Sequence, residues 1–162
     1  ATPPIWGTES AAQTRDATLI RPPQSYVSAA GPQTTLIGFI AQDASTFQQL
    51  LAAGSAGRAA YILNTNIQAY DGANAAATSG GVVAGVLTRA ATRYPSGGIG
   101  ASANGGAVAT ASFDGSMGSG GTVGLGDDGA GSNGFSGYIT RLAIRGTAAN
   151  DADMQLAGTG GR

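Results

Sequence analysis

The amino-acid sequence predicts an all-β protein, an antiparallel β-sandwich with one short helix near its C-terminal end. Roughly nine to twelve short strand candidates follow one another with turn residues about every 8 to 12 positions, a spacing typical of sandwiches. The segment from Gly134 to Leu156 then combines a strand, a turn and a capped helix within one short stretch. Together these observations favour two packed sheets over a helical or mixed fold.

The amino-acid composition limits how much the core can stabilise the fold and which kinds of partner the chain can bind. The chain has 162 residues, enough for one domain, but alanine and 28 glycines provide little of the large apolar area that stabilises a core. We therefore expect neighbouring subunits to add stability, in an oligomer or a lattice. The net charge is −1, which argues against a nucleic-acid partner or a polybasic membrane tether. No apolar run reaches the length of a membrane span or a signal-peptide core, so the chain either avoids that export route or has lost a leader.

The N-terminal residues 1–16 contain two prolines, one tryptophan and no hydrophobic period, which predicts an extended arm. Trp6 is a candidate for docking onto a neighbouring subunit, although it could also fold back over its own domain. The sandwich is expected over residues 17–158, with a flexible tail at 159–162. A short strand at 18–20 is limited to an edge or a loop by the prolines that follow it.

The first half of the sandwich contains several strand candidates. They lie at residues 34–41, 45–53, 58–63 and 67–70. Segment 45–53 also fits helical spacing, and we prefer a strand because its neighbours are β. Asn64 tolerates a positive φ and predicts a hairpin turn between the last two candidates. The stretch DGANAAATSGG at 71–81 is expected to be a loop.

The second half follows the same pattern. Strands are expected at residues 82–94, 99–103, 106–112, around Val123 and Leu125, and at 138–144. The Asn104-Gly105 pair is the strongest hairpin signal in the chain. In the last strand, alternation places Tyr138, Leu142 and Ile144 on one face and Arg141 on the other, beside Ile139, Ala143 and Arg145.

The predicted helix occupies residues 150–158. Asn150 is placed to cap its N-terminus, with Asp153 three residues later and Asp151 in the first turn near the positive end of the helix dipole. Gly158 is expected to end the helix. Tyr138, Arg141, Leu142 and Asn150 are thus all predicted to have structural roles.

Two motifs resemble those of the concanavalin A-like (LamG-like) jelly-roll domains of phage tail and other virion proteins. The residues that match their Ser-x-Asn-Gly-Gly hairpin and Gly-Tyr-Ile-x-Arg-Leu closing strand are Ser102, Asn104, Gly105 and Gly106, and Gly137, Tyr138, Ile139, Arg141 and Leu142. The match is good over 82–156, weaker over 34–81 and absent from 1–16. It departs from the family at Arg145-Gly146, where an aromatic-proline pair is common, and in the helix, where Asn150 and Asp153 replace Ser and Glu.

The resemblance implies a concanavalin A-like jelly roll displayed on a virion, outside the cell, and often able to bind glycans. Its partners would be copies of itself, other virion proteins or a host-surface glycan. The main hypothesis is a virion structural or decoration protein, and the alternative is a carbohydrate-binding module for host attachment. The resemblance does not imply catalysis.

The residues themselves also argue against an enzyme. Glycosidases of this superfold need two carboxylates, yet the single glutamate, Glu9, lies in the predicted arm. Histidine and cysteine are absent, which excludes Ser-His and Cys-His nucleophile pairs.

Three groups of side chains are candidates for ligand contacts. Tyr70 with Asp71, and Arg93 with Tyr94, could each pair an aromatic surface with a planar polar group for a sugar, although tyrosines at strand ends more often belong to the core edge. Asp127, Asp128 and Asn133 could bind Ca²⁺ through oxygen ligands. We favour the alternative for that loop, a solvated turn in which these side chains bond their own backbone. No other cofactor is expected.

The resemblance of the closing strand to the Gly-Tyr-Ile-x-Arg-Leu motif implies a structural role for Arg141, and the alternative is that Arg141 lies on a merely solvated face. We expect its guanidinium to lie over the neighbouring sheet surface and to bond carbonyls or a carboxylate.

Overall fold

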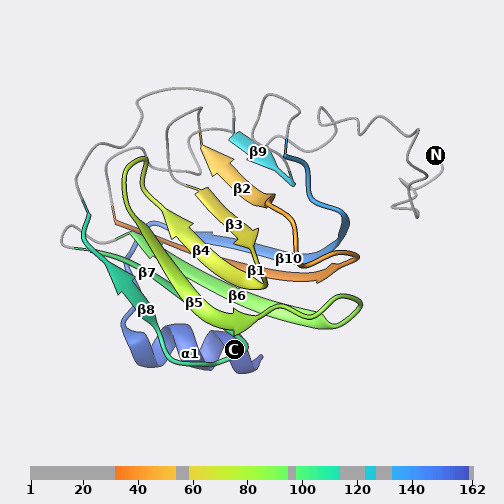
Figure 1. Ribbon diagram of the computed structural model, residues 1–162. Helices are drawn as coiled ribbons and strands as arrows, with labels where there is room; N and C mark the ends of the chain where they lie inside the picture. The colour runs from red at the N-terminus through yellow and green to blue at the C-terminus, as the bar shows by residue number, and fades with distance from the viewer. Residues whose placement is uncertain (1–31, 54–58, 95–97, 114–122, 127–132, 161–162) are drawn as a thin grey trace, which may run out of the picture.

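The computed structural model describes residues 32–53, 59–94, 98–113, 123–126 and 133–160. Within these ranges, two antiparallel sheets pack face to face and a single helix, α1, lies beside them (Figure 1). The predicted arm with Trp6, the strand at 18–20, and Asp127 and Asp128 lie outside the described residues. No described helix is long and apolar enough to cross a membrane.

The strands order themselves into two five-stranded sheets. The bounds are β1 Gln33–Ala41, β2 Gln48–Ala53, β3 Ala59–Leu63, β4 Asn66–Tyr70, β5 Ala75–Gly81, β6 Leu87–Tyr94, β7 Ile99–Ala103, β8 Ala109–Ala111, β9 Val123–Leu125, β10 Gly137–Arg145 and α1 Asp151–Thr159. Sheet A has the order β10-β1-β6-β7-β8, and sheet B has the order β5-β4-β3-β2-β9. The predicted all-β sandwich with one short C-terminal helix is confirmed.

The main core lies between the two sheets. Phe39 from sheet A and Leu50, Ile62 and Ile67 from sheet B are fully buried there. Phe135 meets Phe39 edge to face, with ring centroids 5.5 Å apart. Each such side chain stabilises the fold by about 1.5–3 kcal/mol on burial, so a small number of large residues supports the sandwich.

Both predicted asparagine turns are confirmed. Asn64 and Thr65 have φ values of 51° and 66° between β3 and β4, and Asn104 and Gly105 have values of 52° and 76° after β7. Paired positive φ values match the right-handed twist of adjacent strands. Asn104 also joins the two sheets, because its Oδ1 accepts from Arg89 N at 2.9 Å and its Nδ2 donates to the carbonyl of Gly81 at 2.8 Å.

The largest differences between the predicted and the observed strands fall in three segments. The prediction of a loop at 71–81 is wrong, because residues 75–81 form the edge strand β5. Ala76 and Thr78 of this strand point inward, and its backbone pairs with β4. The small residues of β5 show no apolar alternation that would predict a strand. Backbone hydrogen bonds to β4, and not burial of large side chains, hold this strand in the sheet. The strand expected at 82–94 begins only at Leu87, because Gly85 turns the chain at φ 76°. The strand expected at 106–112 is shorter in the structure, where only β8 at Ala109–Ala111 is a strand.

Strand β10 contains a β-bulge that changes its inward and outward faces. Arg141 pairs with Gly38 but Ile139 pairs with the next residue of β1, so Thr140 is an extra residue. Ile139 therefore packs on the main core with Leu142 and Ile144, whereas simple alternation had placed it on the face of Arg141. The prediction that Tyr138 shares their face is wrong, because the extra residue shifts the alternation by one position and leaves Tyr138 36% exposed.

Helix α1 begins as predicted and ends later. Asn150 caps it, since its Oδ1 accepts from Asp153 N at 2.8 Å. The predicted stop at Gly158 is wrong, because the helix continues to Thr159 and Gly160 provides the left-handed C-cap at φ 89°. Residues 161–162 of the predicted tail lie outside the described residues. Gly158 is buried in the helix instead, where a Cβ would lie 2.9 Å from the Cα of Gly105.

A second, smaller apolar cluster fixes α1 on the outer face of sheet A. Met154 is fully buried against Leu36 and Ala91. At the helix start, Arg93 forms an ion pair with Asp151 at 2.6 Å and donates to the carbonyl of Ala149 at 2.9 Å. The helix therefore covers one part of this outer face and leaves another part open.

Candidate ligand-binding groove

The outer face of sheet A carries side chains in rows of three across β10, β1 and β6. In order along the strands, the rows are Tyr138-Ile40-Leu87, Arg141-Gly38-Arg89, Ala143-Leu36-Ala91 and Arg145-Thr34-Arg93. Alternate residues of one strand lie about 6.8 Å apart, which sets the spacing of the rows. Helix α1 covers the third row through Met154 and reaches the fourth through Asp151. We call the two uncovered rows the apolar row (Tyr138-Ile40-Leu87) and the arginine row (Arg141-Gly38-Arg89).

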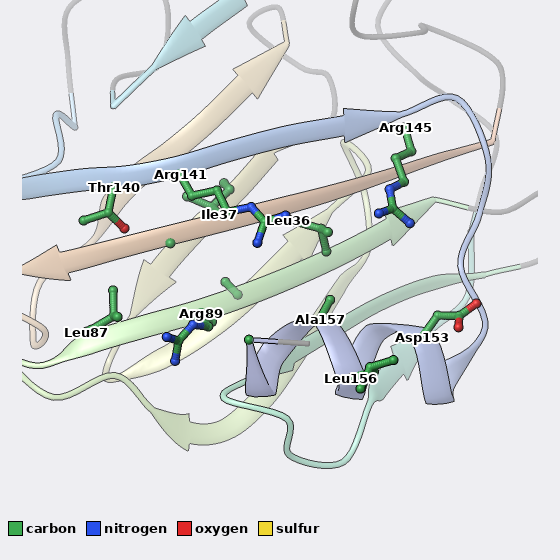
Figure 2. Close-up of a pocket in the computed structure, with 13 residues that line it drawn as sticks. Leu36, Ile37, Leu87, Arg89, Thr140, Arg141, Arg145, Asp153, Leu156 and Ala157 are labelled. Atoms are coloured by element: carbon green, nitrogen blue, oxygen red, sulfur yellow. The ribbon is translucent and has the colours of Figure 1, made fainter. Parts of the chain in front are cut away.

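A groove of about 370 Å³ lies over the arginine row, between β10 and α1. Figure 2 shows Arg141 and Arg145 on one side of it, and Arg89 and the helix residues on the other. Leu87 and Leu156, 38% and 52% exposed, provide apolar surface at its edges. This volume is within the range usual for small-ligand sites.

Gly38 forms the floor of the groove. The bulge brings β10 so close that a Cβ on Gly38 would lie 2.8 Å from Thr140 Oγ1 and 3.4 Å from Arg141 Cβ. The middle position of the arginine row has no side chain of its own, and the groove above it is lined by Arg141 and Thr140 on one side and by Arg89 on the other. A glycine inside a strand often marks a place where another group approaches the backbone closely.

The groove is electropositive and its arginines are unneutralised. Among the described residues, Arg89, Arg141 and Arg145 have no ion pair and no hydrogen bond from their guanidinium groups, whereas Arg93 is paired. Asp153 is the one carboxylate in the described lining, so three arginines against one aspartate give a local charge of +2 on a chain with net charge −1. The predicted bond from Arg141 to a carbonyl or carboxylate is absent within the described residues, because its guanidinium extends over the groove (Figure 2).

The predicted pair Tyr70 and Asp71 lies on sheet B, away from this groove. Asp71 is completely buried, and its Oδ1 accepts from the backbone N–H groups of Ala73 and Asn74 at 2.9 and 2.6 Å. Tyr70 donates its hydroxyl to the carbonyl of Gly72 at 2.5 Å. The prediction of a ligand contact is wrong for Asp71, because its carboxylate shapes the turn after β4 and is not accessible.

The predicted pair Arg93 and Tyr94 is divided between the two faces of sheet A. Tyr94 is 2% exposed and donates its hydroxyl to the carbonyl of Ala59 at 2.7 Å, so it links the two sheets inside the core. Its predicted ligand contact is therefore wrong. Arg93 points outward but is occupied with Asp151 and Ala149 at the helix start.

The predicted calcium ligands are only partly described. Asn133 is exposed, has φ 51°, and its carbonyl accepts from Gln49 N at 2.9 Å. Asp127 and Asp128 lie outside the described residues, and the described part of the chain holds no group of three or more side chains suited to a metal. A calcium site in this loop stays a prediction.

Arg89, Leu87 and Gly38 were missed in the sequence. Gly38 interrupts an otherwise apolar strand, TTLIGFIA, and this interruption was the available signal. Leu87 and Arg89 of β6 belong to the site because of the register between β6 and β1, and the sequence around each residue does not reveal that register.

No family model and no curated protein sequence matches this chain. Solved structures do resemble it. The CBM40 of the Ruminococcus gnavus IT-sialidase, bound to α2,3-sialyllactose, has a TM-score of 0.69 at 18% identity, covering 83% of this chain and 86% of that one. The fold is a concanavalin A-like jelly roll.

Two other neighbours share this jelly roll within larger proteins. The leech intramolecular trans-sialidase has a TM-score of 0.70 at 18% identity, with 83% of this chain and 24% of that chain covered. Domains LG4-5 of the mouse laminin α1 chain give 0.58 at 13% identity, with 78% and 40% covered. These low identities show the fold alone. None of the three is a virion protein, so display on a virion stays a prediction from the sequence resemblance.

Proposed function

We propose that this jelly roll is a non-catalytic carbohydrate-binding module and that its glycan lies across the apolar row and the arginine row. The observation that carries the proposal is their position side by side on the part of sheet A that α1 leaves open. Carbohydrate-binding modules among the structural neighbours support the same function. This is the alternative hypothesis from the sequence, and we propose a different site for it.

The two rows suit the two kinds of surface on a sugar. A pyranose ring has an apolar C–H face, and Tyr138 and Leu87, 36% and 38% exposed, offer an aromatic and an aliphatic surface to it. Its hydroxyl groups need donors, and the free guanidiniums of Arg141 and Arg89 each present planar arrays of N–H groups. A ring resting on the apolar row would therefore place its substituents over the arginine row.

The same groove is poorly suited to glycoside hydrolysis. Glycosidases position two carboxyl groups on either side of the scissile bond. In the described lining, Asp153 is the single carboxylate, and it lies on α1 among three arginines. We therefore propose binding without bond cleavage.

The test uses two aromatic residues of matched exposure, one on sheet A and one that packs against sheet B. Tyr138 beside the arginine row is 36% exposed, and Phe47, which contacts Tyr61 of sheet B, is 37% exposed. A glycan array first identifies a ligand for the wild-type chain, and titration calorimetry then compares Tyr138→Ala with Phe47→Ala. We expect the first variant to bind about tenfold more weakly, roughly 1.4 kcal/mol, and the second to bind as the wild type does.

Two outcomes would contradict the proposal. If the wild-type chain binds no glycan on a broad array, the jelly roll is not a carbohydrate-binding module. If binding is lost in Phe47→Ala and kept in Tyr138→Ala, the sugar site is on sheet B and the groove is not the site.

A further inference from the structure

We infer that the saccharide bound in this groove is acidic, and that its carboxylate lies over Gly38 between Arg141 and Arg89. The inference rests on the proposed function and adds the chemical class of the ligand. It depends on the geometry of the arginine row, on its uncompensated charge and on the apolar row beside it.

Strand register places the two arginines on opposite sides of Gly38. Arg141 and Arg89 are both register partners of Gly38, so their Cα atoms are two strand spacings apart, about 9.6 Å. Both belong to the outer face and line the groove together with Gly38 and Thr140, and the Thr140 hydroxyl lies 2.8 Å from the position that a Cβ on Gly38 would take. An extended arginine side chain reaches well beyond half of this separation. An anion above Gly38 is therefore within reach of both guanidiniums.

The charge of the free groove favours such an anion. Arg89, Arg141 and Arg145 line the same space without acidic partners among the described residues, and only Asp153 opposes them there. Like charges gathered in this way repel one another, and a bound anion relieves the repulsion. The contrast with Arg93, which Asp151 neutralises 2.6 Å away, shows that this part of the fold pairs an arginine where its role is to fix the helix.

Carboxylate on a sugar is the anion that fits this groove best. The planar guanidinium fork matches a carboxylate through two parallel hydrogen bonds. The exposed Tyr138 and Leu87 beside the arginine row suit the C–H face of the ring that carries the carboxylate. A long polyanion such as a nucleic acid would need a larger basic surface than a chain of net charge −1 provides.

The experiment compares each acidic oligosaccharide with its carboxyl-reduced form. An array carries sialate- and uronate-containing oligosaccharides, each printed beside the same oligosaccharide with the carboxylate reduced to an alcohol. We expect the wild-type chain to bind the acidic form at least tenfold more tightly, and raising the salt concentration should reduce that preference. The reduced forms should show little dependence on salt.

Four variants assign the preference to residues. Arg141→Gln and Arg89→Gln should each remove most of the preference, whereas Arg141→Lys, which keeps the charge but loses the fork, should keep only part of it. Asp153→Asn removes the opposing charge and should strengthen binding of the acidic form. Equal urea midpoints for the variants and the wild type would show that the exposed substitutions leave the fold intact.

The possible results distinguish a failure of this inference from a failure of the proposed function. Equal binding of acidic and reduced forms would overturn the inference and leave carbohydrate binding standing, whereas no binding to either form would overturn both. If Arg141→Gln and Arg89→Gln both still bind the acidic form more tightly than the reduced form, the carboxylate does not bind at the arginine row. Equally tight binding of duplex DNA or other polyanions would show non-specific charge attraction and would also overturn the inference.

Discussion

Replacing Gly158 with alanine tests how closely α1 approaches the hairpin turn of sheet A. A helical Gly→Ala change ordinarily stabilises a helix by up to about 1 kcal/mol. At this position the added Cβ would lie 2.9 Å from the Cα of Gly105 and 3.2 Å from the carbonyl carbon of Asn104. Both atoms belong to the backbone of a tight turn, so neither can rotate away. The helix must therefore move.

The size of that movement gives the expected magnitude. Carbon atoms prefer separations of about 3.5–4.0 Å, so the helix must shift by roughly 1 Å. The shift loosens the packing of Met154, a fully buried residue of α1, against Leu36 and Ala91 of sheet A. Overpacking of this kind costs about 1–3 kcal/mol, which exceeds the gain in helix propensity. We expect a net loss of about 1–2 kcal/mol.

Thermal and urea denaturation of Gly158→Ala measure this loss, with Gly146→Ala as the control. Gly146 has no atom within 4 Å of an added Cβ, so its substitution should change stability by no more than about 0.5 kcal/mol. For a domain of this size, we expect the melting temperature of Gly158→Ala to fall by roughly 2–8 °C. A Gly158→Ala variant as stable as the wild type, or more stable, would refute the close approach of helix and turn.

Two further predictions concern the core and the loop after β1. Tyr94→Phe removes the hydroxyl that donates to the carbonyl of Ala59 and should cost about 1–3 kcal/mol, and an unchanged urea midpoint would contradict the proposed link between the sheets. Hydrogen bonds from Thr46 and then Ser45 lower the pKa of Asp43 from 3.8 to about 2, so its contribution to stability is complete above pH 3.8 and is lost as the pH falls through 2. An NMR titration of this carboxyl should give a midpoint near 2, moving upward in Thr46→Val; a midpoint at 3.8 in the wild-type chain would exclude these bonds in solution.

Local chemistry predicted the turns and caps of this fold well. Asn64 and Asn104 adopt the positive φ values that their side chains tolerate, and Asn150 caps the helix, because each of these features depends on a few adjacent residues. Strand β5 was not predicted, because it depends on pairing with another strand and not on adjacent residues. Its alanines and glycines carry little β preference, and the strand exists because β4 pairs with it.

The site could not be predicted in the same way, because it forms between segments far apart in the sequence. Gly38 meets Arg89 and Arg141 through pairings that depend on register, and register follows from the packing of the whole sandwich. Alternation correctly placed Arg141 on the outer face but placed Tyr138 on the wrong one, since the bulge at Thr140 lies between them. Tyr94 was misassigned because its strand, LTRAATRY, consists mostly of small and polar residues with no clear alternation, so the sequence does not distinguish the inward face from the outward face.

The bulge at Thr140 also affects which other chains this domain can join. Among the described strands, β10 is an edge of sheet A, and a nine-residue edge offers a row of free N–H and C=O groups to which a strand of another molecule can pair. The extra residue bends that row and interrupts its regular spacing, and Arg141 and Arg145 add charge along it. A second sheet therefore cannot extend this one continuously through β10. Among the four edges of the two described sheets, β10 is therefore poorly suited to pairing between neighbouring copies of the domain.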